Sequence, residues 1–482
     1  MFEFFTGYWP YLIEAFALVA GICGAVHAIM TKRDVRSAIG WAALLIMAPI
    51  VGVLLYIVFG INRIRIRRRL RRRKVATVRL SPNRGLTVAD AVEEIQVPQR
   101  FLPMKRLGDS VTDYPLTAGN CVEPLESGDV CYNSMLADID RAKTWILLET
   151  YIFDNDHIGR RFVERLAAAT KRGVEVRVLV DAIGARYSRP SILTNLSAAG
   201  IPHALYMGGI IGPRLPYANL RTHRKLLIVD NRICFIGGMN IREAFSGEVT
   251  GILANHDTHF RVQGPVVEDL AYIFADDWLF ASGERLPKSA TARNSQTCSG
   301  NILARAVPSG PDRQLECTHD MIMGILSVAS ERVAIMTPYF LPDRALIGAL
   351  AVAARRGVRI DMLLPLRSNL PIVGFAVTAH LEEVIEIGCR VWQSPGVFDH
   401  SKLMAVDRQW AYIGSSNLDP RSFRLNFEID LELYDIAIAT WIEKRIDSHI
   451  AKARRVRIAD LVSRPFWHRL RDKTAWLASP YL

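Results

Sequence analysis

His223-Arg224-Lys225-Leu226-Leu227-Ile228-Val229-Asp230 reads H-x-K-x4-D, and His400-Ser401-Lys402-Leu403-Met404-Ala405-Val406-Asp407 repeats the pattern. Each copy is followed by a turn of small residues that ends in asparagine. The two turns are Gly237-Gly238-Met239-Asn240 and Gly414-Ser415-Ser416-Asn417. The histidines are 177 residues apart, and so are the asparagines. One such motif can arise by chance, but two with the same tail indicate an internal repeat.

The repeat extends outward from the motifs. Leu147–Phe153 corresponds to Ile335–Leu341, with Tyr151 matched to Tyr339, and Arg172–Leu179 corresponds to Arg356–Leu363. In the first copy a periodic helix over 162–170 ends at a glycine and is followed by an apolar strand over 174–180. Strands that alternate with helices predict an α/β fold with helices on the faces of a sheet. We therefore expect two tandem α/β domains that pack as a pseudo-twofold unit.

Two apolar runs stand at the start of the chain, Tyr8–Met30 and Ala38–Ile61. Each is long enough to cross about 30 Å of hydrocarbon as a helix, so a transmembrane hairpin is predicted. A cleavable signal peptide fits less well, because no Lys or Arg precedes the first run and a second run follows. Glu14 and His27 are polar residues in the first run; they indicate a helix–helix contact, a tilted segment or a functional role.

Charge is concentrated next to these runs. The formal net charge is +12, and nine basic residues lie within 63–74. This run predicts that the rest of the chain is cytoplasmic and that it contacts an anionic bilayer. The remainder is only mildly basic, which argues against a nucleic-acid partner. Seven scattered cysteines without a C-x-x-C pair argue against disulfides and a zinc site.

The expected organisation follows from these features. Residues 1–62 form two transmembrane helices, and 63–113 form a basic juxtamembrane segment and linker. The first α/β domain covers 114–284, a connecting segment covers 285–301, and the second domain covers 302–482. The C-terminal part, around Phe466–Leu477, is either an interfacial amphipathic segment or a helix docked on the core.

The motifs predict the chemistry. His and Lys two residues apart on a strand lie on the same face, so each motif directs an imidazole and an ammonium at one spot. Two such pairs without a carboxylate or cysteine cluster suit phosphoryl transfer with no metal and no cofactor: one histidine attacks phosphorus and the other protonates the leaving alcohol. The predicted catalytic set is His223, Lys225, Asp230, His400, Lys402 and Asp407. Within it, the two aspartates precede the next strand and are interpreted as turn or tether residues.

Further polar residues are predicted to support this set. Lys225, Lys402, Asn240, Asn417 and Ser415 are expected to bind the substrate phosphate. Asp257 and Glu428, one in each half, are expected to accept from an imidazole nitrogen and so fix its tautomer. The near symmetry of the halves leaves the nucleophile open; we predict His223.

These motifs resemble those of the phospholipase D superfamily, from about Leu116 to the C-terminus. Bacterial cardiolipin synthases are the closer match. The similar segments are Asn219–Lys225, Gly237–Ile241, Asp257–His259, Thr337–Phe340 and the N-terminal hairpin with Lys32-Arg33-Asp34. The family usually has an aromatic and a basic residue before the aspartate at 257, where Asn255 and His256 stand here. The resemblance implies that two phosphatidylglycerol molecules yield cardiolipin and glycerol through a phosphohistidine, at the bacterial cytoplasmic membrane.

Other functions use the same residues. Hydrolysis to phosphatidic acid differs only in whether water is excluded, and another acceptor alcohol would make a different phosphatidyltransferase. A membrane-tethered nuclease requires a continuous strip of basic residues to bind the nucleic-acid backbone, and the α/β part of the sequence has no strong one. A non-enzymatic tether does not require two intact motifs. A homo-oligomer is compatible with the sequence, which does not fix the oligomeric state.

Overall fold

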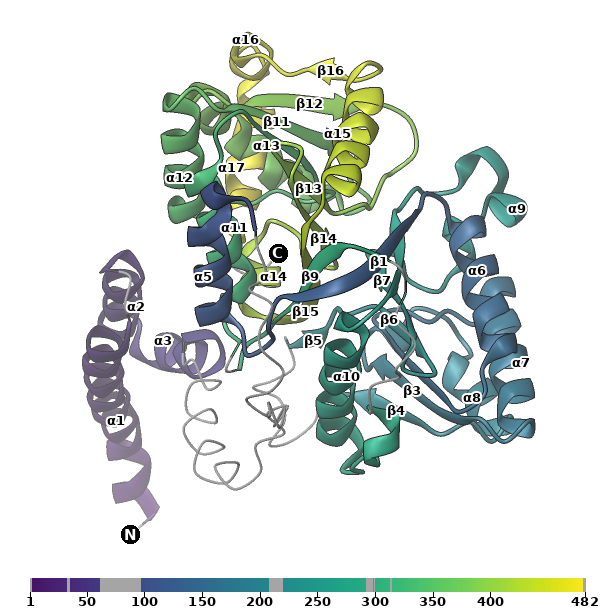
Figure 1. Cartoon of the computed structure of the whole chain (residues 1–482). Coiled ribbons are helices and arrows are strands. Elements are labelled where there is room, and N and C mark those ends of the chain that lie inside the picture. Colours follow the sequence, from purple (N-terminus) through teal and green to yellow (C-terminus); the bar gives the residue numbers. More distant parts are fainter. Residues whose placement is uncertain are drawn as a thin grey trace. The chain divides into compact units, whose positions relative to one another are not determined.

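The structure is a computed structural model that describes residues 2–32, 35–60, 97–207, 220–291, 298, 300–312 and 314–479 (Figure 1). The N-terminal helices and the large α/β part form separate units. The predicted basic run at 63–74 lies outside the described residues.

The N-terminal unit begins with the single long helix α1, Phe2–Thr31. Its apolar part, Tyr11–Thr31, is the only described segment long and apolar enough to cross a membrane. The second expected span is not one helix. It consists of α2 (Val35–Met47), α3 (Pro49–Leu55) and a π-helical turn at Tyr56–Gly60. Pro49 disfavours helical geometry at the residue before it, and Ala48 there has φ −137° and ψ 68°, so the second apolar run is divided into two helices. That this run crosses the membrane stays a prediction.

Close backbone contacts hold these helices together. A Cβ on Gly21 would lie 2.4 Å from the carbonyl oxygen of Leu45, so only glycine allows α1 to approach α2 this closely. The Nδ1 atom of His27 lies 2.8 Å from the hydroxyl of Tyr56. His27 therefore makes a helix–helix contact, whereas Glu14 is on the exposed side of α1.

The first half of the α/β unit follows a short helix, α5 (Leu102–Val111). Its strands are β1 (Thr117–Leu125), β2 (Trp145–Thr150), β3 (Glu175–Asp181), β4 (His203–Tyr206), β5 (Arg221–Thr222), β6 (Leu226–Val229), β7 (Ile233–Gly237) and β8 (His259–Gln263). Its helices are α6 (Gly128–Arg141), α7 (His157–Lys171), α8 (Ile192–Ala198), α9 (Gly247–Thr250) and α10 (Val266–Ser282).

The second half repeats this order. Its strands are β9 (Ile302–Ser309), β10 (Arg332–Met336), β11 (Arg359–Pro365), β12 (Arg390–Ser394), β13 (Leu403–Val406), β14 (Trp410–Gly414), β15 (Asn426–Tyr434) and β16 (Arg454–Arg455). Its helices are α11 (Cys317–Val328), α12 (Arg344–Arg355), α13 (Pro371–Glu386), α14 (Pro420–Arg424), α15 (Ile436–Ile450), α16 (Ile458–Val462) and α17 (Phe466–Trp476).

Local signals explain the matching helices α7 and α12. Each begins after an aspartate, Asp156 or Asp343, whose side chain accepts from a backbone N–H three residues on. Each is followed by a glycine, Gly173 or Gly357, at φ +89°, which suits a left-handed helix end. The helix predicted over 162–170 is therefore longer at its start, because the aspartate cap lies six residues before Phe162, where the apolar periodicity becomes clear.

The two halves form one continuous sheet. Its strand order runs β12-β11-β10-β13-β14-β15-β9 in one half and β1-β8-β7-β6-β2-β3-β4 in the other, with β16 beside β12. The second list is the first in reverse, and β9 pairs with β1 in antiparallel fashion at the seam. This reversed order is what pseudo-twofold symmetry between the halves produces, and it confirms the predicted α/β fold with two tandem domains.

The register of the repeat differs by one residue from the prediction at β2. Thr150 donates to the carbonyl of Ile152, and Thr337 donates to that of Tyr339. Phe153 and Phe340 make matching isolated bridges to Ile241 and Leu418, the residues that follow the asparagine of each turn. The backbone offset here is therefore 187 residues, one fewer than the match of Tyr151 with Tyr339 predicts. The two tyrosine rings nevertheless pack edge-on against matching histidines, Tyr151 against His223 and Tyr339 against His400.

A shared core joins the halves. Helices α10 and α15 contribute to one buried cluster together with β6–β8 of the first half and β13–β15 of the second. Separate clusters cover the opposite faces, one under α6–α8 and one under α11 and α12 (Figure 1). In the expected linker, Met104 of helix α5 and Phe101, just before this helix, pack into the cluster under α11. The shared core holds the two motif-bearing hairpins in a fixed relation.

The C-terminal helix α17 combines both predicted alternatives. Ala475 packs against α13 in a small apolar cluster. On its outer side Phe466 and Trp467 are 67% and 72% exposed. The helix is thus docked on the α/β unit and still presents an aromatic face.

Candidate active site

Both histidines are positioned by a strand of the other half. The short strand β5 runs parallel to the start of β15, and the backbone N–H of His223 donates to the carbonyl of Phe427 at 2.8 Å. In the same way the N–H of His400 donates to the carbonyl of His256 at 2.8 Å. Each histidine therefore enters the seam beside the residue that precedes a buried carboxylate.

The imidazole–carboxylate pairs cross between the halves. Nδ1 of His223 lies 2.9 Å from Oε2 of Glu428, and Nδ1 of His400 lies 2.9 Å from Oδ2 of Asp257. Both carboxylates are fully buried, and the histidines are 9% and 7% exposed. When each Nδ1 carries the proton and donates to its carboxylate, each Nε2 keeps its lone pair.

The two carboxylates are held differently. Glu428 accepts from the hydroxyls of Ser415 and Ser422 at 2.6 and 2.8 Å and from the amide of Asn426 at 3.1 Å. Oδ1 of Asp257 is buried and has no hydrogen-bond partner among the described residues. Gly238 occupies the position that corresponds to Ser415, and a Cβ there would lie 2.7 Å from Oδ2 of Asp257.

The protonation tendencies of the carboxylates follow from these surroundings. Burial raises the pKa of Glu428, and the charge of Lys225 and the serine hydroxyls offset this only in part. Burial acts on Asp257 in the same direction, but the hydrogen bond and charge of His400 leave its pKa below the usual value. Asp257 is thus the more firmly anionic partner, and it better stabilises a protonated imidazole.

The motif lysines lie beside the histidines. Nζ of Lys225 donates to the carbonyl of His223, and Nζ of Lys402 lies 3.0 Å from Nε2 of His400. Burial lowers the pKa of Lys225 to about 7 and that of Lys402 to about 8. Burial and the lysine charges also hold the pKa of His223 well below its ordinary value and bring that of His400 to about 4. Two partly desolvated ammonium groups beside neutral imidazoles form a site that favours an anion.

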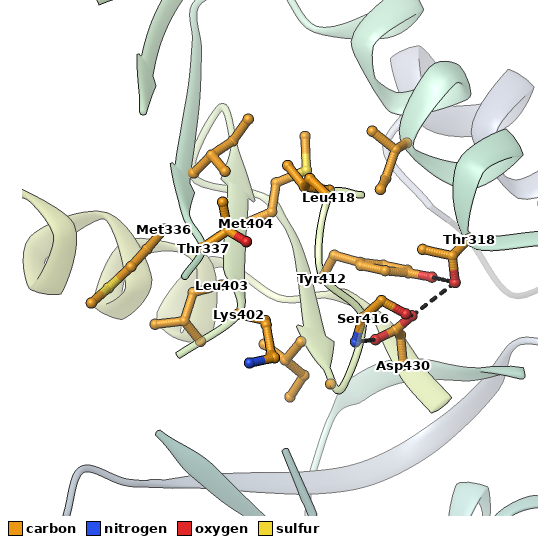
Figure 2. Close-up of a pocket in the computed structure, with 14 residues that line it drawn as sticks. Thr318, Met336, Thr337, Lys402, Leu403, Met404, Tyr412, Ser416, Leu418 and Asp430 are labelled. Carbon is orange, nitrogen blue, oxygen red and sulfur yellow. Dashed lines mark hydrogen bonds between the residues drawn. The ribbon is translucent and has the colours of Figure 1, made fainter. Parts of the chain in front are cut away.

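A small recess surrounds Lys402 on one side (Figure 2). Most of its lining is apolar, with Met336, Leu403 and Met404 near the lysine. At its other side Thr318 and Ser416 both donate to Asp430. Neither motif histidine lines this recess.

The asparagines after the hairpins lie in the same seam but differ in their contacts. Oδ1 of Asn240 accepts from the backbone N–H of Ile152 at 3.2 Å. Oδ1 of Asn417 is buried without a partner among the described residues. The hydroxyl of Ser415, expected to bind phosphate, donates to Glu428 and accepts from the N–H of Ile429 at 3.0 Å. These contacts favour a role for Ser415 in orienting Glu428.

The motif aspartates lie at the far end of each hairpin from the histidines. Asp230 accepts from the backbone N–H groups of Lys143, Thr144 and Trp145 at 2.7–3.1 Å. Asp407 accepts from those of Ser330, Glu331 and Arg332 at 2.8–2.9 Å. Both start a turn with two successive residues at positive φ. These bonds tie each hairpin to the start of β2 or β10 and favour a structural role for the two aspartates.

Several nearby residues were not singled out from the sequence. The ring of Tyr151 packs edge-on against His223, with ring centres 5.2 Å apart. The guanidinium groups of Arg221 and Arg421 add positive charge near the same seam, because Arg421 lowers the pKa of both His223 and Arg221. Arg224, between the motif residues, is buried; its Nε donates to the carbonyl of Glu428 at 3.0 Å and it pairs with Asp277. Of these, Tyr151, Arg221 and Arg224 stood inside quoted segments without a predicted role, and nothing in the spacing marked Arg421.

The chain matches two described families. Residues 135–278 and 322–450 match "Cardiolipin synthase, PLD-like domain", and residues 22–60 match "Phospholipase_D-nuclease N-terminal". Both halves of the α/β unit are covered by the first match.

Curated relatives extend over nearly the whole chain. Cardiolipin synthase A of Pseudomonas aeruginosa is 32% identical over 96% of this chain and 94% of its own length. The major cardiolipin synthase ClsA of Bacillus subtilis is 28% identical over 98% of this chain and 99% of its own. Among solved structures, a phosphatidylserine synthase of Haemophilus influenzae covers 79% of this chain and all of its own, with a TM-score of 0.61 and 16% identity. The last likeness shows the fold alone.

Proposed function

Because the chain belongs to the cardiolipin synthases with phospholipase D-like domains, we propose that it transfers a phosphatidyl group from one phosphatidylglycerol to another. The products are cardiolipin and glycerol. The enzyme is a phosphatidyltransferase, and the paired motifs supply its chemistry.

One observation carries the proposal: each motif histidine is oriented by a carboxylate of the opposite half. An imidazole whose Nδ1 donates to a buried carboxylate keeps its Nε2 lone pair for attack or proton transfer, and that of His400 faces Nζ of Lys402 at 3.0 Å. Two such imidazoles, flanked by Lys225 and Lys402, provide a nucleophile, an acid–base and charge for a phosphodiester. This is what a double displacement at phosphorus requires.

In the first step Nε2 of His223 attacks the phosphorus of the donor lipid. The bond from phosphorus to the terminal glycerol oxygen breaks, and His400 in its protonated form supplies the proton that this oxygen needs. Glycerol leaves, and the phosphatidyl group remains on His223. The phosphate charge brought by the lipid favours protonation of His400, which its position beside anionic Asp257 also supports.

In the second step the glycerol hydroxyl of another phosphatidylglycerol is the nucleophile. His400, now neutral, accepts its proton while the oxygen attacks the phosphorus. The bond to Nε2 of His223 breaks, cardiolipin forms, and both histidines return to their starting protonation states. Because both motifs are buried, water is a poor competitor for this step.

The choice of His223 as nucleophile is supported by its carboxylate. Glu428, with its raised pKa and three further donors, stabilises an imidazolium less than Asp257 does. His223 is therefore the more readily neutral imidazole, as a nucleophile must be. Lys225, Lys402, Asn240 and Asn417 are proposed to surround the phosphate oxygens.

The substrate dictates where the enzyme works. Helix α1 is long enough to anchor the chain in a bilayer, and the proposed location is the bacterial cytoplasmic membrane. The basic run at 63–74 supports a cytoplasmic position for the α/β unit and contact with anionic lipid. A reporter fused to the C-terminus, read for accessibility on each side of the membrane, tests this sidedness.

The direct test is detergent-solubilised protein with labelled phosphatidylglycerol and a chelator, followed by separation of the lipids. Cardiolipin and free glycerol, both lost in His223→Ala and His400→Ala, are the expected products. Phosphatidic acid as the sole product would replace the proposal with hydrolysis. No turnover of the lipid would overturn the choice of donor.

A further inference from the structure

A second group of ligand-type side chains lies next to the histidine pair. His256, Asp399 and His449 bring one nitrogen or oxygen each to within 4.8 Å of one another. Among the described residues this is the one such group of three. His256 belongs to the first half, whereas Asp399 and His449 belong to the second. An isolated bridge between His256 and Asp399 holds the two backbones side by side.

His449 on α15 is already oriented as a metal ligand would be. Its Nδ1 lies 2.9 Å from the carbonyl oxygen of Arg445, which can only accept, so Nδ1 carries the proton. Nε2 is then unprotonated, and it lies 3.8 Å from Oδ2 of Asp399. A backbone carbonyl that fixes the tautomer in this way is a common partner of metal-bound histidine.

Asp399 presents a free oxygen to this group. The residue is 7% exposed, and its Oδ1 accepts from the N–H of Ser401 at 2.9 Å. Oδ2 is buried and has no hydrogen-bond partner among the described residues. A buried carboxylate oxygen without a donor is costly, so it indicates a position at which a cation can bind.

One cation lies nearby. Nη2 of Arg445 lies 3.9 Å from Oδ2 of Asp399, which is beyond hydrogen-bond distance. Nη1 of the same residue lies 2.8 Å from Oε2 of Glu126. Arg445 therefore balances part of the charge of Asp399 without occupying its coordination position.

We propose that His256, Asp399 and His449 bind one divalent transition-metal cation, of which Zn²⁺ suits the ligands best. Two imidazoles and one carboxylate are a ligand set for Zn²⁺ or Co²⁺ with a water in the fourth position, whereas Mg²⁺ and Ca²⁺ prefer oxygen. Small side-chain rotations would bring the three atoms from their present spacing to bonding distance.

The proposed metal site contains residues of both halves and lies next to the catalytic residues, but none of the catalytic residues is a metal ligand. His256 precedes Asp257, and Asp399 precedes His400, so a bound cation fixes both backbones that carry this imidazole–carboxylate pair. The cation is a clamp, and the transfer chemistry proceeds without it. This inference is independent of the identity of the lipid substrate.

The test is a titration of the full-length, detergent-solubilised protein with Co²⁺, after purification through a tag that contains no histidine. One equivalent is expected, with visible d–d absorption of a nitrogen–oxygen site and no thiolate charge-transfer band. Zn²⁺ should displace it and raise the Tm.

Substitutions assign the signal to this cluster. His449→Ala should weaken Co²⁺ binding at least about 100-fold and abolish the Zn²⁺-dependent rise in Tm. His157→Ala, at an exposed histidine on α7, should change neither. His256→Asn, at an exposed position, provides a second variant if His449→Ala does not fold. Equal binding by wild type and both variants, no binding at all, or a thiolate band would each overturn the proposal.

Discussion

The hydroxyl of Ser415 donates to Oε2 of Glu428 at 2.6 Å, and the same carboxylate oxygen lies 2.9 Å from His223. The other half has no counterpart of this bond, because Gly238 replaces the serine and leaves no space beside Asp257. The pseudo-twofold fold therefore contains two chemically different histidine pairs. This difference underlies the proposed division of labour between nucleophile and acid.

Gly238→Ala should damage the pair formed by His400 and Asp257. The new Cβ would lie 2.7–2.8 Å from both carboxylate oxygens of Asp257, which must move and misalign the imidazole. We expect the rate of cardiolipin formation to fall at least about 100-fold, as for other displaced acid–base groups. Gly348→Ala is the control, because a Cβ there meets no atom within 4 Å. An unchanged rate in Gly238→Ala would argue against a role for Asp257.

His400→Ala should accumulate a phosphatidyl group on His223. Without the acid–base, formation of the adduct slows, but its breakdown also lacks a base to activate the acceptor hydroxyl. Intact-protein mass spectrometry after incubation with phosphatidylglycerol, followed by peptide mapping, identifies the modified residue. An adduct on His400 in the His223→Ala protein would reverse the two assignments.

The rate constant kcat/KM should fall as pH rises above about 7. Burial brings the pKa of Lys225 to about 7 and that of Lys402 to about 8, so both lysines lose their charge in the free enzyme as pH rises through these values. An anionic phosphate then binds less well, and kcat/KM reports this free-enzyme titration. Lys225→Arg should move the decline to higher pH, since guanidinium stays charged.

Lys105→Arg, at a lysine paired with Asp109 on α5, is the control for that profile. The same alkaline decline in wild type and in Lys225→Arg would show that another group is responsible.

Asp407→Asn should lower the free energy of unfolding and have a smaller effect on the rate of cardiolipin formation. The carboxylate accepts from three successive backbone N–H groups and pairs with Arg100, and an amide in its place loses the charge and one acceptor. The expected loss is about 2–4 kcal/mol, or a fall in Tm of roughly 5 °C. Asp140→Asn, at an exposed ion pair with Arg165, should leave the Tm unchanged. A lost rate at unchanged Tm would instead point to a direct part in catalysis.

Much of this architecture could be predicted from the sequence. The repeated motif identified the two hairpins, and the strand–helix–strand pattern gave the fold class. Three features escaped prediction for physical reasons. The second apolar run has continuous hydropathy, but its helix is interrupted before Pro49. Apolar length alone therefore could not show that this run is divided into two helices. The repeat shifts by one residue near Thr337, where side-chain identity misled the alignment.

The crossing of the carboxylates also escaped prediction. Asp257 and Glu428 could each be recognised as an acid that follows a motif, but sequence order favours partners in the same half. Only the structure shows that each carboxylate contacts the histidine of the other half, through the pairing of β5 with β15 on one side and the bridge between His256 and Asp399 on the other. The group formed by His256, Asp399 and His449 is hidden for the same reason, since its members become neighbours only when the halves close on each other.

The crossed pairs also bear on the synthesis of the protein. Strand β15 lies within the last sixty residues, and Glu428 on it completes the site around His223. A growing chain whose first half has folded carries His223 and Lys225 without the carboxylate that orients the imidazole. We expect such a chain to be unable to modify lipid while it is still attached to the ribosome. Reactivity toward the membrane is thus withheld until the second half, which carries Glu428, has been synthesised.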